Sequence, residues 1–529
     1  MTTHSQEFNS TRIIILISSI IVSLSAGTNY AFSAYSPQLA ERLKLSSTTL
    51  NAIGISGNIG MYFASPIVGG IIDRIGPRKP LLFASGLLFL GYGIVWEIFR
   101  SNPIPSSDQD QKLIKSNPIT VAILAFGMLL TGIGSSTALS SAAGAAAKSF
   151  HSRIRATVIG FTLAGFGLSA FFWTRIGALF FSDDTSSFLL VLSLGTSSFI
   201  LIGVCGLSSL DTLEQERRPK IESLADDEQE SSAIATSSHQ DLSPSQDQEH
   251  TTQETIQSID EKVDVYGTKL MKTLDFWLLW IVMGCCCGTA LMIINNIGTM
   301  IATLDFQEHP PTSTHPSDPN NSSIVSHIQS NQVSLLSVFN CLGRIFAGLI
   351  SDTLEARYGL SKVWWLCWVS SLFLLSQYLG QQVVKNLSSI SLLTGLTGFA
   401  YGNMYGSGPN LMIIWFGVDH FTTNFGFLNL APVFAGQIIN LSFGQIYDAH
   451  YRQNPLPNQL LCMEGQACYR DAFRITIVSC GIALFLAGVL VLRNRNGNGN
   501  RLHKRKLSGS DEETSTEQTW MLGSPTLTA

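Results

Sequence analysis

The sequence predicts an all-α membrane protein with twelve transmembrane helices in two six-helix halves, and three observations support this fold class. First, 45% of the 529 residues are hydrophobic and only 13% are charged, whereas about 25% of the residues in a soluble domain are charged. Second, apolar runs of roughly 20 residues, the length that crosses a bilayer, recur along the chain. Third, one long polar segment divides these runs into six and six.

The first six apolar runs predict an N-terminal half at residues 13–209, after a short cytosolic N-terminus at residues 1–12. The first run continues directly into the next ones, so we expect a span there and not a cleavable signal peptide. The six expected spans are at about 13–36, 48–72, 80–99, 119–147, 156–181 and 187–209.

The second six runs predict a C-terminal half at residues 274–492. Residues 210–273 between the halves are rich in Ser, Gln, Asp and Glu and almost free of aromatic residues, and the tail at 493–529 is similar. Such segments cannot bury enough apolar surface to become ordered, so we expect a disordered linker and tail. The expected spans are at about 274–304, 329–351, 363–380, 389–415, 426–447 and 473–492.

The distribution of basic residues predicts the orientation of the spans. With the N-terminus in the cytosol, 22 of the 32 Lys and Arg residues lie on the cytosolic side, as the positive-inside rule requires. Both termini, the linker and the tail are then cytosolic. Sequons for N-glycosylation lie in the non-cytosolic loops, at Asn320, Asn321 and Asn386.

Composition also excludes several function classes. A net charge of −5 gives no electrostatic reason to bind nucleic acid. No Cys/His spacing resembles a zinc site, and we expect neither metal nor cofactor. An intramembrane enzyme needs a nucleophile with a base or a metal cluster, and the spans hold no such set, so we expect no enzyme. The expected partners are a small-molecule substrate and the lipid bilayer, and we expect a monomer.

A short motif recurs at matching positions of the two halves. Residues 69–79 read GGIIDRIGPRK after the second span, and residues 348–352 read GLISD after the eighth. In both copies a glycine lies four residues before an aspartate, so the two share one helix face. Two six-helix halves related by a parallel repeat are one known transporter architecture.

The first copy resembles the cytosolic loop signature of the major facilitator superfamily, G-x-x-x-D-R-x-G-x-[RK]-[RK]. In that family the acid and the bases form a clasp that stabilises the outward-facing state. The resemblance implies the same fold here, and it implies a gating role for the matching residues of both copies. These are Gly69, Asp73, Arg74, Gly76 and Arg78, with Gly348 and Asp352 in the second copy.

Within this superfamily, four segments are similar to the nodulin-like branch and its fungal monocarboxylate-transporter-like relatives. The segments are residues 27–36, 294–298, 401–417 and 424–448. This resemblance implies a carrier that moves a small organic solute by alternating access, in the vacuolar or the plasma membrane, with the vacuole favoured. A nutrient sensor that signals through the cytosolic linker is a second interpretation.

Arg344 is the strongest candidate for binding a substrate. It lies eight residues before Asp352, which is roughly 12 Å along a helix, and a charge at such depth in a bilayer is a functional candidate. The pattern of Arg344, Gly348 and Asp352 resembles the eighth span of monocarboxylate transporters, in which the arginine binds the substrate carboxylate. A guanidinium can bind a carboxylate with two hydrogen bonds. The alternative is a structural arginine that caps helix carbonyls or pairs with Asp352.

Uncharged polar residues are further candidates, because spans one, four, seven and ten have no Asp, Glu or His at mid-membrane. The proton-coupling groups usual in the monocarboxylate transporters are therefore missing, and a facilitator or a carrier of a neutral or zwitterionic solute such as an amino acid fits equally well. Amide side chains in such spans bind polar solutes or join neighbouring helices. The candidates are Asn29, Tyr30, Asn295, Asn296, Tyr401, Asn403 and Asn410. For the serines of span four, including Ser136 and Ser140, we expect close packing.

Two of the nine cysteines, Cys462 and Cys468, lie in a polar loop on the expected non-cytosolic side. Oxidising compartments preserve disulfides, and Gly465 between them permits a tight turn, so we expect a disulfide. The alternative is a pair of free thiols. The other seven cysteines lie in apolar runs, where cysteine behaves as a small hydrophobic residue.

Overall fold

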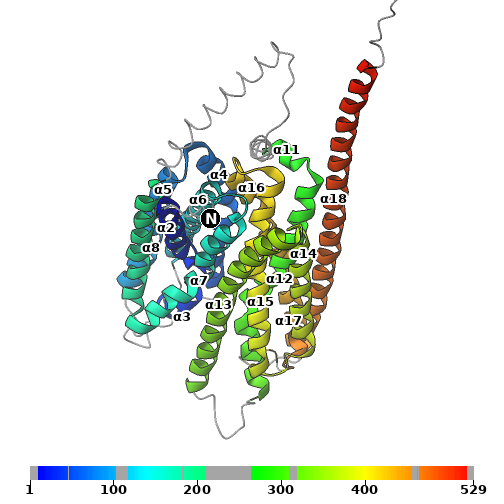
Figure 1. The fold of residues 1–529 in the computed structure, drawn as a ribbon. Coiled ribbons are helices and arrows are strands. Elements are labelled where there is room, and N and C mark those ends of the chain that lie inside the picture. Colours follow the sequence, from blue (N-terminus) through cyan, green and yellow to red (C-terminus); the bar gives the residue numbers. More distant parts are fainter. Residues whose placement is uncertain are drawn as a thin grey trace, which may run out of the picture.

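A computed structural model of the chain describes residues 10–45, 47–102, 117–181, 184–209, 264–308, 319–453, 462 and 464–520. Within these residues the secondary structure is helical throughout, and the helices form two bundles side by side (Figure 1). The blue to cyan bundle is the N-terminal half and the green to red bundle is the C-terminal half. The expected all-α fold class is confirmed.

The N-terminal half contains eight helices in the described residues. They are α2 (Ser10–Ala26), η1 (Thr28–Ala34), α3 (Ser36–Leu43), α4 (Ser47–Ile75), α5 (Arg78–Ser101), α6 (Pro118–Ser149), α7 (Arg155–Phe180) and α8 (Thr185–Leu207). The first span was expected to be one helix at 13–36, but α2 ends at Ala26 and a 3₁₀ helix follows. Gly27 lies at the break, and glycine is a poor helix former.

The C-terminal half has a matching series of helices. They are α11 (Thr268–Met271), α12 (Leu274–Glu308), α13 (Pro319–Tyr358), α14 (Trp364–Gln382), α15 (Leu387–Phe416), α16 (Phe421–Leu428), α17 (Leu430–Gln453) and α18 (Ala467–Trp520). The eleventh span is therefore divided into α16 and α17. Residues 210–263 of the linker expected at 210–273 lie outside the described residues, whereas residues 264–273 are described and include α11.

The last helix is longer than the sequence suggests. We expected the span to end at residue 492 and the tail to be disordered, but α18 continues to Trp520 and projects beyond the bundle (Figure 1). Extending an existing helix avoids the unfavourable nucleation step, so polar residues can follow an apolar span in helical form. Residues 521–529 lie outside the described part of the chain.

In the described residues, ten helical segments are long and apolar enough to cross a membrane. The other two expected spans correspond to α14 and α15. The sequence of α15 is rich in Gly, Ser, Asn and Tyr, and its residues are mostly buried from Thr394 to Ile413. A helix that faces other helices needs less apolar surface than one that faces lipid, which explains its lower hydropathy.

The repeated glycines let the two halves approach closely. A Cβ atom on Gly69 of α4 would collide with the carbonyl oxygen of Thr422 at the start of α16, and one on Gly348 of α13 would collide with that of Ala156 at the start of α7. Each contact joins one half to the other. We call this end of the molecule, where α11 and α16 lie at the top of Figure 1, the clasp end.

Candidate functional site

A central cavity lies between the two halves. It is small, with a volume of about 10 Å³, and no acidic side chain is among the described residues that line it. Because both halves contribute to the lining, any movement of one half against the other changes the shape of this cavity. The lining residues are Tyr30, Met61, Tyr62, Ser65, Ser136, Leu139, Ser140 and Phe166 from the N-terminal half, and Arg344, Tyr405 and Asn429 from the C-terminal half.

Arg344 is the one basic residue of this cavity lining, and its side chain is 1% exposed. Its Nε donates a hydrogen bond to Asn340 Oδ1 at 3.0 Å, and its Nη1 donates to the carbonyl oxygen of Leu163 on α7 at 2.8 Å. The guanidinium carbon lies 5.2 Å from the ring centre of Phe166 and 5.0 Å from that of Tyr405. Aromatic rings attract a cation but do not neutralise it.

The hydrogen-bond acceptors of Arg344 are thus neutral, and within the described residues no carboxylate pairs with it. The expected alternative partner, Asp352, forms its ion pair with Lys362 instead. A buried charge without an ionic partner is costly. Arg344 therefore offers its positive charge to an anion that enters the cavity, while the Leu163 contact shows that it also binds a helix carbonyl.

Hydroxyl groups line the rest of the cavity. The hydroxyl oxygens of Tyr30 and Tyr62 are 3.0 Å apart, and the Tyr30 ring meets Phe166 edge-on. Ser136 and Ser140, which we expected to serve close packing, lie in the cavity lining instead. The turn of α6 that carries them faces the interface between the halves, which the composition of one helix does not reveal.

Tyrosines on α15 extend this aromatic surface. The rings of Tyr401 and Tyr405 have centres 5.0 Å apart. The Tyr401 hydroxyl is buried and has no hydrogen-bond partner among the described residues. Tyr401 therefore lies beside the cavity, one helical turn from Tyr405.

The candidate amides lie outside the cavity lining. Asn29 accepts a hydrogen bond from Thr131 Oγ1 at 3.0 Å and joins η1 to α6. Asn296 donates to Asn440 Oδ1 at 2.9 Å and joins α12 to α17. Asn403 donates to the carbonyl oxygen of Phe399 in its own helix. Two further candidates complete the set: Asn295 is exposed and Asn410 is buried.

The N-terminal copy of the repeated motif forms a contact that we call the N clasp. Asp73 accepts hydrogen bonds from the backbone N–H of Thr423 at 2.8 Å and from its Oγ1 at 2.7 Å. Thr423 lies in the first turn of α16, where free N–H groups and the helix dipole favour an anion. Lys148 of α6 lies 3.5 Å from the same carboxylate.

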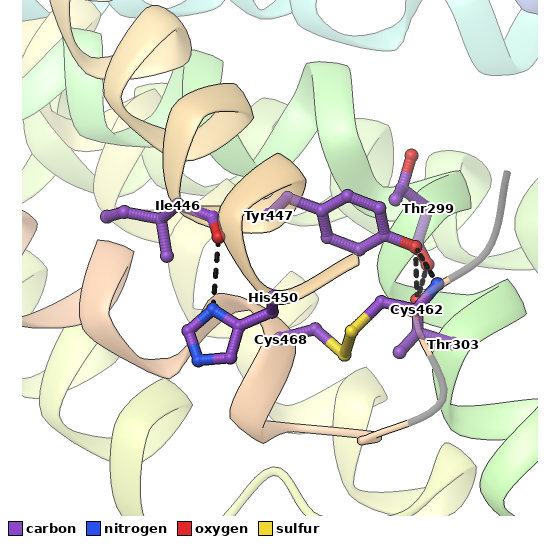
Figure 2. Close-up of a disulfide and its surroundings, with 7 residues drawn as sticks. All are labelled: Thr299, Thr303, Ile446, Tyr447, His450, Cys462 and Cys468. Carbon is purple, nitrogen blue, oxygen red and sulfur yellow. Dashed lines mark hydrogen bonds between the residues drawn. A yellow bond between two sulfur atoms is a disulfide. The ribbon is translucent and has the colours of Figure 1, made fainter. Parts of the chain in front are cut away.

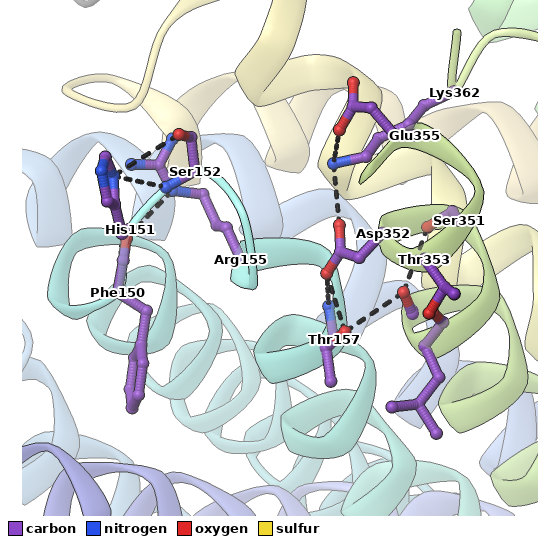
Figure 3. A network of polar contacts seen from close by, with 12 residues as sticks. Phe150, His151, Ser152, Arg155, Thr157, Ser351, Asp352, Thr353, Glu355 and Lys362 are labelled. Carbon is purple, nitrogen blue, oxygen red and sulfur yellow. Dashed lines mark hydrogen bonds and ion pairs between the residues drawn. The ribbon is translucent and has the colours of Figure 1, made fainter. Parts of the chain in front are cut away.

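The C-terminal copy forms the matching C clasp, which Figure 3 shows. Asp352 accepts hydrogen bonds from the backbone N–H and the Oγ1 of Thr157, both at 2.7 Å, in the first turn of α7. Lys362 lies 2.8 Å from Asp352 and 2.8 Å from Glu355. Each clasp therefore joins an aspartate of one half to a helix N-terminus of the other.

The resemblance implied Arg74 and Arg78 as partners of Asp73. The structure places Lys148 and Thr423 at the Asp73 carboxylate, and Arg74 is exposed. Consecutive helical residues point in different directions, so Arg74 cannot share the face of Asp73. The sequence contains a signal for the threonine contacts, because α7 and α16 each have a threonine as their third residue.

Comparisons with known proteins agree with this geometry. Residues 16–314 match the family model for the Major Facilitator Superfamily. The chain belongs to this superfamily. It is 25% identical to a probable transporter MCH1 of Gibberella zeae, over 91% of this chain and 90% of that protein. It is also 23% identical to the uncharacterized membrane protein YMR155W of Saccharomyces cerevisiae, over 89% and 93% of the two chains.

Solved structures of the superfamily share the fold. The chain is similar to the transporter FucP in its outward conformation, with a TM-score of 0.53, 12% identity and coverage of 91% of this chain and 99% of that one. The proton:xylose symporter XylE gives a TM-score of 0.54, 14% identity and coverage of 89% and 95%. The major facilitator chain is thus an integral multi-pass membrane protein, and its family indicates membrane transport and not catalysis.

At the end of this major facilitator fold opposite to the clasps, Cys462 and Cys468 form a disulfide, with 6.2 Å between their Cα atoms. These are the two cysteines for which the sequence predicts a disulfide. The Tyr447 hydroxyl accepts a hydrogen bond from the Cys462 N–H at 3.1 Å and lies 3.1 Å from Thr303 Oγ1 (Figure 2). The disulfide loop therefore connects α12, α17 and α18. We call this end the disulfide end.

The glycosylation candidates lie at or near helix starts. Asn386 is exposed directly before α15, at the disulfide end. Asn320 and Asn321 lie in the first turn of α13, and their side chains are outside the described residues.

Proposed function

We propose that this chain is a carrier that moves a small monocarboxylate across a membrane by alternating access, with Arg344 as the residue that binds the carboxylate. The observation that carries the proposal is the environment of Arg344, a fully buried cation in a cavity between the halves with neutral hydrogen-bond partners. A guanidinium retains its charge at every physiological pH and matches the two oxygens of a carboxylate.

The cavity lining favours one negative charge over two charges or a zwitterion. A dicarboxylate would bring a second anion to a site with one basic residue, and an amino acid would bring an ammonium group to a lining without an acid. Either group would lose its hydration without an ionic partner, which is costly. The hydroxyls of Tyr30, Tyr62, Ser136 and Ser140 instead suit the uncharged polar part of a small hydroxy or keto acid.

The clasps supply the gate of this carrier. Hydrogen bonds join the halves at residues 65–73 of α4 and at residues 157–163 of α7, which are the clasp-end parts of both helices. Such a state is closed at the clasp end, which the distribution of basic residues places in the cytosol. Transport then requires that both clasps break, so that the halves rock around the cavity and present it to the cytosol.

Uptake into proteoliposomes tests the substrate. Arg344→Gln removes a charged hydrogen bond and is expected to lower the uptake of a labelled monocarboxylate by about 10- to 100-fold, as the loss of roughly 1.5–3 kcal/mol requires. Arg344→Lys keeps the charge but lacks the planar guanidinium, so its uptake should lie between that of the wild type and that of Arg344→Gln. The matched control is Arg175→Gln on α7, because Arg175 is exposed and lies outside the cavity lining.

Three outcomes would contradict the proposal. Wild-type uptake by the folded Arg344→Lys protein would show that transport does not require a guanidinium bound to both oxygens of the carboxylate. Uptake of neutral amino acids but of no monocarboxylate would assign the cavity to a zwitterion. A protein that binds a solute without moving it would be a sensor, the second interpretation of the sequence.

For the membrane, we propose the vacuole, which the resemblance favours, with the disulfide end in the lumen. Microscopy of a fluorescently tagged chain in a fungal cell distinguishes the vacuolar membrane from the plasma membrane.

A further inference from the structure

Three residues near the end of the central linker are attached to the C-terminal half. We call residues 264–266 the linker anchor. The backbone N–H of Val265 donates a hydrogen bond to the carbonyl oxygen of Phe416 at 2.9 Å. The Val265 carbonyl oxygen accepts one from Asn424 Nδ2, also at 2.9 Å. The main chain of Val265 is therefore held from both sides by the residues around the connection between α15 and α16.

Side chains strengthen this attachment. The carboxylate of Asp264 pairs with Nδ1 of His420. The ring of Tyr266 stacks on the His420 imidazole, with ring centres 3.6 Å apart and an angle of 10° between the ring planes. The side chains of His420 and Asp264 are 33% and 23% exposed, so the pair is partly shielded and yet can separate without opening the core.

The attached residues belong to the helix that closes the N clasp. His420 is the N-cap residue of α16, and Asn424 is the fourth residue of this helix. Between them is Thr423, whose N–H and Oγ1 both donate to Asp73 of the opposite half. The anchor and the clasp therefore act on the same few residues of one short helix.

We propose that the linker anchor is a regulatory strap, which holds the N-terminus of α16 in the position from which it binds Asp73. An attached anchor then favours the state that is closed at the clasp end, and a released anchor favours opening. Residues 210–263, which precede the anchor, are acidic and rich in serine. Separation of Asp264 from His420 is the event that releases the anchor. This inference goes beyond the transported solute, and it rests on the proposed function only in taking the clasp end as a gate.

Distance measurements between the halves test the strap. Spin labels on unnatural amino acids at Lys79 and Tyr358, both exposed at the clasp end, leave the native cysteines intact. The full chain is placed in lipid nanodiscs without substrate. Asp264→Asn is expected to raise the ratio of open to closed molecules by about three-fold, the size of effect that a partly exposed ion pair supports. Asp264→Glu keeps the charge and should restore the wild-type ratio.

A second pair of variants tests the stacking contact. Tyr266→Ala removes the ring from His420 and is expected to raise the same ratio by about two- to three-fold. The matched control is Tyr378→Ala, because Tyr378 is 54% exposed on α14 and is far in sequence from the anchor. An equal effect of both substitutions would overturn a specific role for Tyr266.

A double-mutant cycle decides whether the anchor acts through the clasp. In an Asp73→Asn background the N clasp is already weakened, so Asp264→Asn should add little to the ratio. An undiminished effect in that background would overturn the proposal, and so would an unchanged ratio in the folded single variant. The distances are measured without solute, so the absence of monocarboxylate uptake would not affect this result. Conversely, an unchanged distance ratio would disprove the regulatory strap without contradicting the transport proposal.

Discussion

The N clasp and the C clasp are related by the internal repeat, but they differ in how their lysines are buried. Lys148 lies 3.5 Å from Asp73 and its side chain is 36% exposed, whereas Lys362 lies 2.8 Å from Asp352 and its side chain is 5% exposed. The contact that both share is an aspartate with the N–H and the hydroxyl of a threonine.

The two clasps also share the way in which their residues are divided between the halves. In both clasps the lysine and the aspartate belong to the same half, and the threonine belongs to the other half. Within each clasp, the hydrogen bonds between aspartate and threonine must break when the halves separate, whereas the ion pair between lysine and aspartate need not. The lysines therefore set the electrostatic environment of the aspartates within each half, and this environment is what differs between the clasps.

The largest expected effect is that of Asp352→Asn on stability. It leaves Lys362 buried with the partly exposed Glu355 as its remaining acid, and removing one partner of a buried ion pair costs about 3–5 kcal/mol. In detergent, the thermal unfolding midpoint of Asp352→Asn should be clearly lower than that of Asp73→Asn, because the partly exposed Lys148 side chain can become solvated when Asp73 loses its charge. Replacing Lys362 by Met in the same chain should recover much of the loss. Equal midpoints for the two single variants would mean that the difference in burial has no energetic consequence.

The next largest effect concerns the gate. Asp73→Asn weakens two charged hydrogen bonds to Thr423, each of which contributes roughly 1.5–3 kcal/mol, and should shift the carrier toward the state open at the clasp end by at least about ten-fold. Labelling of a cysteine placed in the cavity from the disulfide end should decrease accordingly. Unchanged labelling would restrict Asp73 to a role in membrane topology.

A smaller effect is expected for the two threonines, and it should be equal. Thr423→Val and Thr157→Val each remove one hydroxyl donor but keep the backbone N–H, so each should destabilise the closed state by about 1.5 kcal/mol, the lower end of the range for a hydrogen bond to a charged group. The same labelling assay measures both. A much larger effect at one clasp would show that the two clasps contribute unequally to the stability of the closed state.

The smallest effect is that of Lys148→Met. Its ion pair is long and partly exposed, and such pairs contribute about 0–1 kcal/mol. We expect unfolding and uptake close to wild type, whereas Lys362→Met leaves Asp352 buried without its close cation and should lower the unfolding midpoint. A severe defect in Lys148→Met would contradict the division of roles between lysine and threonine.

Much of the candidate site could be predicted because it depends on local sequence. The depth of Arg344, the spacing of glycine and aspartate in both repeats, and the pairing of Cys462 with Cys468 follow from positions along one helix or one loop. The amides of Asn29, Asn296 and Asn403 were less predictable, since the same group serves a solute or a neighbouring helix. The hydrogen bonds of Asn29 and Asn296 to other helices depend on which side chain faces them, whereas Asn403 donates to a backbone carbonyl of its own helix.

The sequence by itself determined the helices, their division into two halves, and the residues of the motif that recurs in both. Hydropathy and helical spacing are properties of short segments, so they are independent of the way in which those segments pack. Only the tertiary structure decided the partners, since Thr423 is 350 positions from Asp73 and Thr157 is 195 positions from Asp352. A hydrogen bond requires two groups within about 3 Å, and the packing of α4 on α16 and of α7 on α13 is what brings these groups together.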